Sequence, residues 1–227
     1  MEVVYCSGDL VVRNNTINLI GERAFGVSVL STAPDANYFI DNNMFDATFS
    51  TSTETTAIAL GTGRTLLPFG PTVENFGTLS ITNNQIIGDP SGNSIRHASG
   101  GWGLAGPGLL IFENNTIKNA SANNAWNTRV AFRVWESPET LFIKVIDNTW
   151  SGTTDLTSPA ALITNLRSGA NVCVELIGNK SPYDPAYYLN NFVGGVFGYT
   201  SNTTSANNNG ETIEFFPSMA DFYICTQ

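Results

Sequence analysis

The sequence has little charge, little cysteine and a single histidine, and each shortage excludes a class of protein. Ten basic and 19 acidic side chains among 227 residues give a formal net charge of −9, so the basic surface that nucleic-acid binding requires is missing. No apolar run approaches the length of about 18 residues that suggests a membrane-spanning helix. Three cysteines and one histidine, far apart in the chain, match no zinc-binding spacing, and we expect no metal or other cofactor.

The N-terminal residues do not resemble a secretory signal. Residues Met1 to Cys6 lack a basic region followed by an apolar run, so no signal peptide is predicted.

Hydrophobic residues make up 42% of the chain, which is enough to bury a core and argues against disorder. We therefore expect one folded domain over residues 1–227.

The polar residues that are present carry almost no charge. Asn occurs 26 times, Thr 25 times and Ser 18 times, together with 21 glycines. Helix surfaces normally use Glu, Lys, Arg and Gln, whereas Asn, Thr, Ser and Gly are typical of strands and turns. The composition therefore predicts an all-β protein.

The asparagines belong to an eight-residue repeat in which apolar residues alternate before an Asn. Examples are Leu79-Ser-Ile-Thr-Asn-Asn-Gln-Ile86 and Leu110-Ile-Phe-Glu-Asn-Asn-Thr-Ile117. Six copies align without a gap, at residues 10–17, 38–45, 79–86, 110–117, 143–150 and 174–181. The sixth position of every copy is Asn, namely Asn15, Asn43, Asn84, Asn115, Asn148 and Asn179.

The repeat predicts a stack of parallel strands. Alternating apolar residues form one face of a strand, and the invariant Asn is interpreted as a bend, because Asn tolerates left-handed backbone angles. Successive sixth-position asparagines are 28, 41, 31, 33 and 31 residues apart, so each repeat has room for two or three short strands. We predict a parallel β-solenoid of about six to seven coils with an internal column of Asn side chains, and with Arg13 one coil from Asp41. An antiparallel β-sandwich with Asn-rich turns is the alternative.

The repeated unit resembles the right-handed parallel β-helix repeat of pectate-lyase-like proteins, and most of all the repeat passengers of bacterial surface proteins and adhesins. The resemblance covers about residues 8–200. It shares a Phe-x-x-Asn element with the chlamydial polymorphic membrane proteins, at Phe112 to Asn115 and at Phe39 to Asn42. Their Gly-Gly-Ala-Ile element has only a distant counterpart, Gly194 to Phe197.

Enzymes of this superfamily act on polysaccharides, but the strings that the resemblance would imply for polygalacturonases or pectate lyases do not occur. The best carboxylate pair is Asp41 and Glu113, which would lie on one outward column two coils apart. That separation, about 10 Å, is near the upper end of the range used by inverting glycosidases. We regard the pair as a weak catalytic candidate. The simpler interpretation is two solvated carboxylates on a strand face, so the sequence favours a protein that is not an enzyme.

Two segments exceed what a regular wall needs. Residues 61–74, which include Arg64, lengthen the second interval, and insertions in solenoids often form binding loops. Residues 183–227 begin with an aromatic cluster and are interpreted either as a cap for the open core or as a sugar- or partner-binding surface. The candidate binding residues are Arg64, Trp102, Tyr183, Tyr187 and Tyr188.

The cysteines leave the redox compartment open. Cys173 lies in a predicted strand and is interpreted as a small buried apolar residue. A bond between Cys173 and Cys225 is the alternative if the last segment forms the next coil, whereas Cys6 and Cys225 would lie at opposite ends of the stack.

These observations favour a non-catalytic stalk or passenger module of a secreted or cell-surface protein, located outside the cell as part of a larger chain and serving adhesion or display. Its expected partners are a host-surface protein or a glycan, with no nucleic acid among them. A carbohydrate-active enzyme, either a polysaccharide lyase or a glycoside hydrolase, and a carbohydrate-binding module are the alternatives. Nothing in the sequence determines the oligomeric state.

Overall fold

The computed structural model places β-strands throughout the part of the chain that it describes. That part comprises residues 2–3, 8–20, 24–29, 36–50, 55–61, 76–89, 97–104, 106–120, 129–134, 140–152, 161–165, 172–182, 187–190, 197–201 and 213–216. Within it there is no helix, and hence no helix long and apolar enough to cross a membrane.

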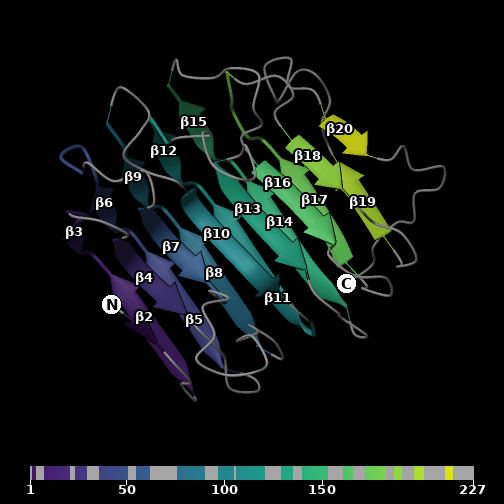
Figure 1. The fold of residues 1–227 in the computed structure, drawn as a ribbon. Helices are drawn as coiled ribbons and strands as arrows, with labels where there is room; N and C mark the ends of the chain where they lie inside the picture. The colour runs from purple at the N-terminus through teal and green to yellow at the C-terminus, as the bar shows by residue number, and fades with distance from the viewer. Residues whose placement is uncertain are drawn as a thin grey trace.

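The strands form three sheets, which we call A, B and C; Figure 1 labels strands of all three. Sheet A contains β1 (Glu2–Val3), β4 (Phe25–Val29), β7 (Thr56–Leu60), β10 (His97–Leu104), β13 (Val130–Val134), β16 (Ala161–Asn165), β18 (Tyr187–Asn190) and β20 (Ile213–Phe216). Sheet B contains β2 (Asp9–Arg13), β5 (Asn37–Asp41), β8 (Thr78–Thr82), β11 (Gly108–Glu113), β14 (Leu141–Ile146), β17 (Val172–Ile177) and β19 (Phe197–Ser201). Sheet C contains β3 (Thr16–Asn18), β6 (Met44–Asp46), β9 (Gln85–Ile87), β12 (Thr116–Lys118) and β15 (Thr149–Ser151).

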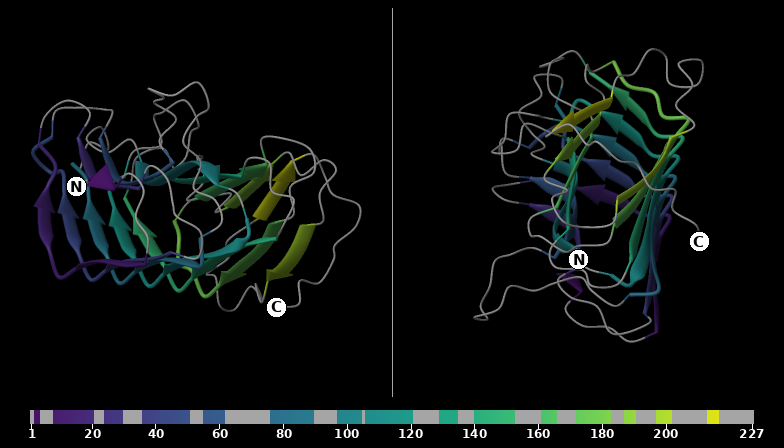
Figure 2. Two further views of the ribbon diagram at one scale, coloured as in Figure 1. Left: turned by 90° about the horizontal axis from the view of Figure 1, so that it is seen from below. Right: turned by 90° about the vertical axis from the view of Figure 1, so that its right-hand side faces the viewer.

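The chain visits the sheets in a fixed cycle. β2, β3 and β4 belong to sheets B, C and A, and the next four sets of three strands, from β5 to β16, repeat that order; the described strands after them, β17 to β20, alternate between sheets B and A. We call each such set a layer. Every described strand pairing is parallel, and each layer hydrogen-bonds to the next, so the layers are stacked along one direction, as the left view in Figure 2 shows. The parallel stacking that the repeat predicts is confirmed, and the antiparallel arrangement is not observed in the described strands.

The strand register reproduces the alignment of the repeats. Leu10 lies opposite Tyr38, Tyr38 opposite Leu79, and Leu79 opposite Leu110, all of them first-position residues. The sixth copy is less complete than the others, because its second half makes only an isolated bridge between Thr149 and Lys180 instead of a sheet C strand.

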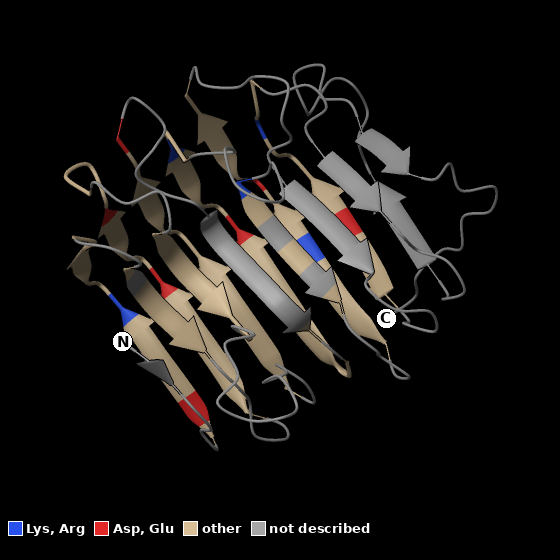
Figure 3. Cartoon of the chain, in the orientation of Figure 1, with Lys and Arg blue, Asp and Glu red and all other residues tan. Residues whose placement is uncertain are grey.

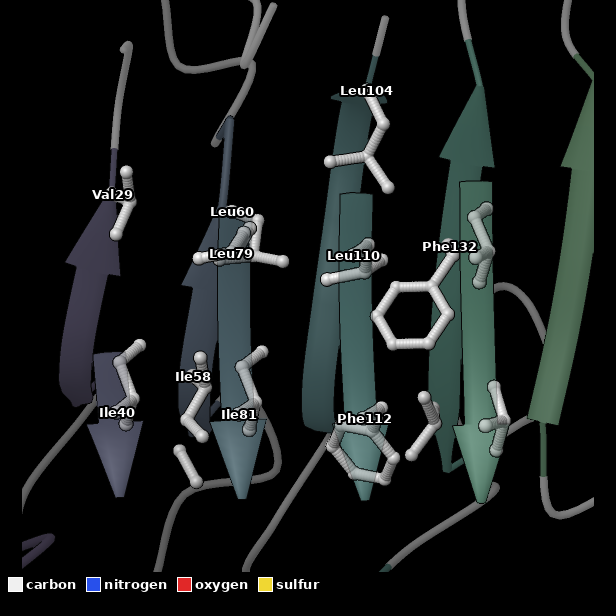
Figure 4. Packing of buried hydrophobic residues seen from close by; sticks show 14 of the residues in the cluster. Val29, Ile40, Ile58, Leu60, Leu79, Ile81, Leu104, Leu110, Phe112 and Phe132 are labelled. Carbon is white, nitrogen blue, oxygen red and sulfur yellow. The ribbon is translucent and has the colours of Figure 1, made fainter. Parts of the chain in front are cut away.

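The core lies between the sheets and is made of the residues that point inward from each strand. Figure 4 shows Ile40, Ile81 and Phe112 in one row on sheet B, with Leu60 and Phe132 of sheet A nearby. All five side chains are fully buried. Because equivalent residues stack at the inter-strand spacing of about 4.8 Å, a single sequence pattern fills the core of every layer.

Two predicted segments fall largely outside the described residues. Of the insertion at 61–74 only Gly61 is described, and of the segment 183–227 only β18, β19 and β20. Whether these segments bind a partner or cap the core stays a prediction, as does a single domain over residues 1–227.

Candidate functional site

The sixth-position asparagines form a continuous ladder of side-chain hydrogen bonds. We call Asn15, Asn43, Asn84, Asn115, Asn148 and Asn179 the amide ladder. The Nδ2 of each of the first five donates to the Oδ1 of the next asparagine over 2.9–3.0 Å. Five of the six side chains are buried, whereas Asn15, in the first layer, is exposed. The predicted Asn column is therefore present, with one exposed member.

The ladder also satisfies main-chain groups inside the bend. The Oδ1 of Asn115, for example, accepts from the main-chain N–H and from the Nδ2 of Asn84. The Nδ2 of Asn115 donates in addition to the carbonyl oxygen of Ile81, 2.9 Å away. Only a carboxamide supplies two donor hydrogens and an acceptor in this compact shape, which explains why the position is Asn in all six copies.

The left-handed bend lies one residue earlier than the sequence suggested. Positive φ angles of 51–64° occur at the fifth position of every copy, not at the sixth. We call these residues the bend column: Asn14, Asn42, Asn83, Asn114, Asp147 and Gly178. The interpretation of the sixth-position Asn as the bend residue was wrong, because its side chain serves the interior, while the fifth residue supplies the backbone angle that Asn, Asp and Gly adopt most easily.

The first three residues of the bend column, Asn14, Asn42 and Asn83, line a polar hollow. Asn42 donates to the Oδ1 of Asn14 over 2.7 Å, and Asn114 donates to the Oδ1 of Asn83 over 2.6 Å. The cavity has a volume of about 300 Å³. Its lining consists of Asn14, Asn15, Thr16, Asn42, Asn43, Met44, Asn83 and Gln85. No ionisable side chain lines it, so this cavity offers neutral hydrogen-bonding groups.

Asp41 is held as an anion beside this hollow. Its carboxylate accepts from the Nε of Arg13, the Oγ1 of Thr82 and the Nδ2 of Asn83, each over 2.8 Å. The predicted proximity of Arg13 and Asp41 in adjacent layers is confirmed. The pKa of Asp41 is lowered, most of all by the hydrogen bond from Asn83; Thr82 and Arg13 lower it further, and together the three donors outweigh the rise that partial burial causes.

The predicted carboxylate pair lies on one column, as expected. Asp41 pairs with Thr82, and Thr82 with Glu113, so the carboxylates are two strands apart, or about 10 Å at the usual spacing. A general acid in a glycosidase needs a raised pKa, whereas the three donors around Asp41 lower its pKa. The geometry is therefore better suited to a structural ion than to an acid catalyst, and a catalytic role for the pair stays a prediction.

The structure does not bring the predicted binding residues into a described site. Arg64 and Tyr183 lie outside the described residues. Trp102 belongs to β10, and Tyr187 and Tyr188 belong to β18, but only the backbone of these three is described. Their role in binding stays a prediction.

Cys173 differs from its sequence interpretation. It lies in β17, is half-buried rather than buried, and is disulfide-bonded. In β17 the buried residues alternate with half-buried ones, and Cys173 belongs to the half-buried set. The interpretation as a small buried apolar residue was therefore wrong. Both other cysteines, Cys6 and Cys225, lie outside the described residues.

Comparisons of the chain with protein-family models, with curated proteins and with solved structures find no match. Among the described residues, no group of three or more His, Cys, Asp or Glu side chains is placed to hold a metal ion. The polar hollow, which the sequence reasoning missed, is thus the candidate site that the structure adds. The sequence signal for it was the Asn at both the fifth and the sixth position in four of the six copies.

Proposed function

We propose that the chain is a right-handed parallel β-helix of six to seven coils, of the pectate-lyase-like kind, and that it acts as a non-catalytic stalk or passenger module of a secreted or cell-surface protein. In this role it holds loops or neighbouring domains outside the cell for adhesion or display. The observation that carries the proposal is the unbroken parallel register of sheet B from β2 to β17, with one amide ladder running beside it.

The interior supports a structural role. A ladder that satisfies both backbone and side-chain groups at each step gives every layer the same geometry, so the stack resists bending at any one layer. Buried apolar columns alongside the ladder reinforce that uniformity. Uniform layers suit a spacer, which must keep a constant shape. A catalytic site instead needs one local geometry that differs from the rest of the stack.

The outer surface also suits exposure to other molecules. The charged residues of the described strands are few and scattered, as Figure 3 shows. Two ion pairs, Arg13 with Asp41 and Lys144 with Glu175, connect adjacent strands. Both lie on the outer face of sheet B, so these charges tie adjacent layers together.

Two measurements test this function. Protease shaving of intact producing cells should release peptides of the chain while a cytoplasmic marker stays intact; protection of the chain to the same degree as the marker would contradict a surface location. Incubation with a panel of neutral and acidic polysaccharides should release no sugar. Reproducible release of sugar that disappears in Asp41→Asn or Glu113→Gln would contradict the non-catalytic role and identify the chain as a carbohydrate-active enzyme.

Glycan binding without turnover is a second candidate function, favoured by the polar hollow. Its volume of about 300 Å³ and its lining of amide and hydroxyl groups suit one sugar residue of a neutral glycan. Amides offer both donors and acceptors to sugar hydroxyls. A glycan array should show binding that is weakened by Gln85→Ala and unchanged by Lys118→Ala on the neighbouring strand β12. Equal binding by the two variants would show that the glycan does not bind in the hollow.

A further inference from the structure

Cys173 lies on the outer face of sheet B and is disulfide-bonded. Its neighbours in β17, Val172 and Val174, are buried in the core, so the side chain of Cys173 between them points away from the core. The chain has two other cysteines, Cys6 and Cys225. The identity of the partner therefore determines which part of the chain is held against the outside of sheet B.

Cys6 is too far along the stack to be the partner. The strand register places Asp9 of β2 and Cys173 of β17 in one column of sheet B, five inter-strand spacings apart. At about 4.8 Å for each spacing, the two residues are about 24 Å apart. Cys6 is three residues from Asp9, a reach of at most about 11 Å, whereas the Cα atoms of a disulfide lie within about 7 Å of each other. The remaining partner is Cys225.

The outer face of sheet B around Cys173 is apolar. In β2, by contrast, the outward side chains Asp9, Val11 and Arg13 are all exposed. Most outward side chains of β14 and β17 are apolar, and they are half-buried although they face away from the core. We call four of them, which pair in register across the two strands, the outer apolar patch: Phe142, Ile146, Cys173 and Ile177. Apolar residues clustered on an outer face indicate a surface that another segment covers.

We propose that residues 217–227 form a strap that packs on the outer apolar patch and is fixed there by a disulfide bond between the Sγ atoms of Cys173 and Cys225. The bond specifies this occupant, because Cys225 belongs to the segment. Three apolar residues, Phe222, Tyr223 and Ile224, directly precede Cys225. Apolar side chains therefore arrive where the patch offers an apolar surface, and their burial against it is favourable.

The strap is long enough to reach the patch. The strand before it, β20, ends at Phe216 in sheet A, nine residues before Cys225. Nine residues span up to about 30 Å when extended, whereas sheets that pack face to face are about 10 Å apart. β20 pairs with β18, the sheet A strand that follows β17 in the chain. The strap therefore has to return along the stack by only about one strand spacing, about 4.8 Å.

The bond makes the cover dependent on redox state. In its formation two thiols lose two protons and two electrons, and a disulfide oxidant accepts them and becomes two thiols. A dithiol reductant reverses the step and frees Cys225. The strap covers the outer apolar patch in the oxidised protein and is released from it in the reduced protein. This device goes beyond the stalk role and does not depend on it.

Peptide mapping of the unreduced protein, alkylated in urea, tests the pairing. Trypsin cleaves after Arg167 and Lys180, so peptides 168–180 and 181–227 should appear as one linked species that dithiothreitol separates. A link between peptides 1–13 and 168–180, or alkylation of Cys173 without reduction, would overturn the proposal.

The rate at which dithiothreitol reduces the disulfide of the folded protein tests the packing of the strap. Phe142→Ser removes an apolar side chain from the patch, and Ile224→Asp places a charge in the strap without changing any residue of sheet B. Both should make reduction several times faster, because both weaken the cover over the bond. The control Phe39→Ser removes another outward, half-buried phenylalanine of sheet B, three strands away, and should leave the rate unchanged.

If Phe142→Ser fails to fold, the comparison of Ile224→Asp with Phe39→Ser decides the same question. Wild-type rates in Ile224→Asp, or equal acceleration by Phe39→Ser, would contradict the packing of the strap on the outer apolar patch.

Discussion

The amide ladder and the bend column occupy adjacent positions in the same repeat, yet different physical demands select their residues. The ladder is Asn in all six copies, whereas the bend column contains four Asn, one Asp and one Gly. Ladder side chains are chosen for buried hydrogen bonds, and bend residues are chosen for a positive φ angle that several residues can adopt. Identical neighbouring letters in a sequence can therefore have unequal tolerance to substitution.

Replacing a central ladder residue should give the largest effect in this comparison. Asn115→Leu, or Asn84→Leu, removes bonds to both neighbouring layers and leaves buried main-chain groups without partners. We expect a loss of about 3–5 kcal/mol in the free energy of unfolding, since each unsatisfied buried group costs about 1–3 kcal/mol. Urea unfolding measures it. If both variants were as stable as the wild type, the side-chain hydrogen bonds of the ladder would not contribute to the free energy of unfolding.

Substitution in the bend column should depend on backbone conformation and not on the amide. Asn114→Val forces a β-branched residue into the left-handed region at φ 52° and should cost about 1–2 kcal/mol. Asn114→Gly should differ from wild type by no more than about 0.5 kcal/mol. Thermal unfolding of the two variants makes the comparison. If glycine were as harmful as valine, side-chain hydrogen bonding would govern this column as well.

The end of the ladder should tolerate what its middle does not. Asn15 is exposed and its Oδ1 accepts no bond from the described residues, so Asn15→Leu leaves no acceptor in the interior unsatisfied. We expect a loss of about 1 kcal/mol or less by urea unfolding. A loss equal to that of Asn115→Leu would mean that the first layer is as tightly enclosed as the fourth.

The outer column should respond to pH, while the neutral ladder should not. Because the pKa of Asp41 is lowered in the folded state, its contribution is present above the unfolded value of about 3.9 and is lost as the pH falls through the folded value. Asp41→Asn should cost less than about 1 kcal/mol at pH 7, as expected for a partly exposed ion pair. The difference in free energy of unfolding between wild type and variant, measured with urea, should disappear below pH 4. A difference that grows on acidification would contradict a lowered pKa of Asp41 in the folded state.

The sequence was informative where one residue has one possible use. Alternating apolar residues such as Leu79 and Ile81 could only line the interior, and their register follows from the gapless repeat. The invariant sixth Asn marked the ladder because the six copies align without a gap, which places these side chains one above another. The assignment of the bend failed because Asn suits both a left-handed backbone and a buried amide, although Asp147 and Gly178, which cannot form such a ladder, were the available clue.

The candidate site was less predictable than the fold. The polar hollow depends on which way the fifth-position side chains point, and that direction follows from the bend and not from the strand alternation. The disulfide of Cys173 was not evident either, because alternation in β17 shows which side of the sheet a cysteine faces but not whether it has a partner. Loop insertions and aromatic clusters carry no periodicity from which a position could be predicted.

The parallel hydrogen bonds between layers have a mechanical consequence. They all run along the stacking direction, so a pull along that direction loads the layers in series, and the weakest junction gives way first. A pull along the strands instead loads all the hydrogen bonds of a junction in shear at once. A tether attached at the two ends of the stack would therefore yield stepwise, one layer of about 4.8 Å thickness at a time, and would absorb work without losing its remaining length all at once.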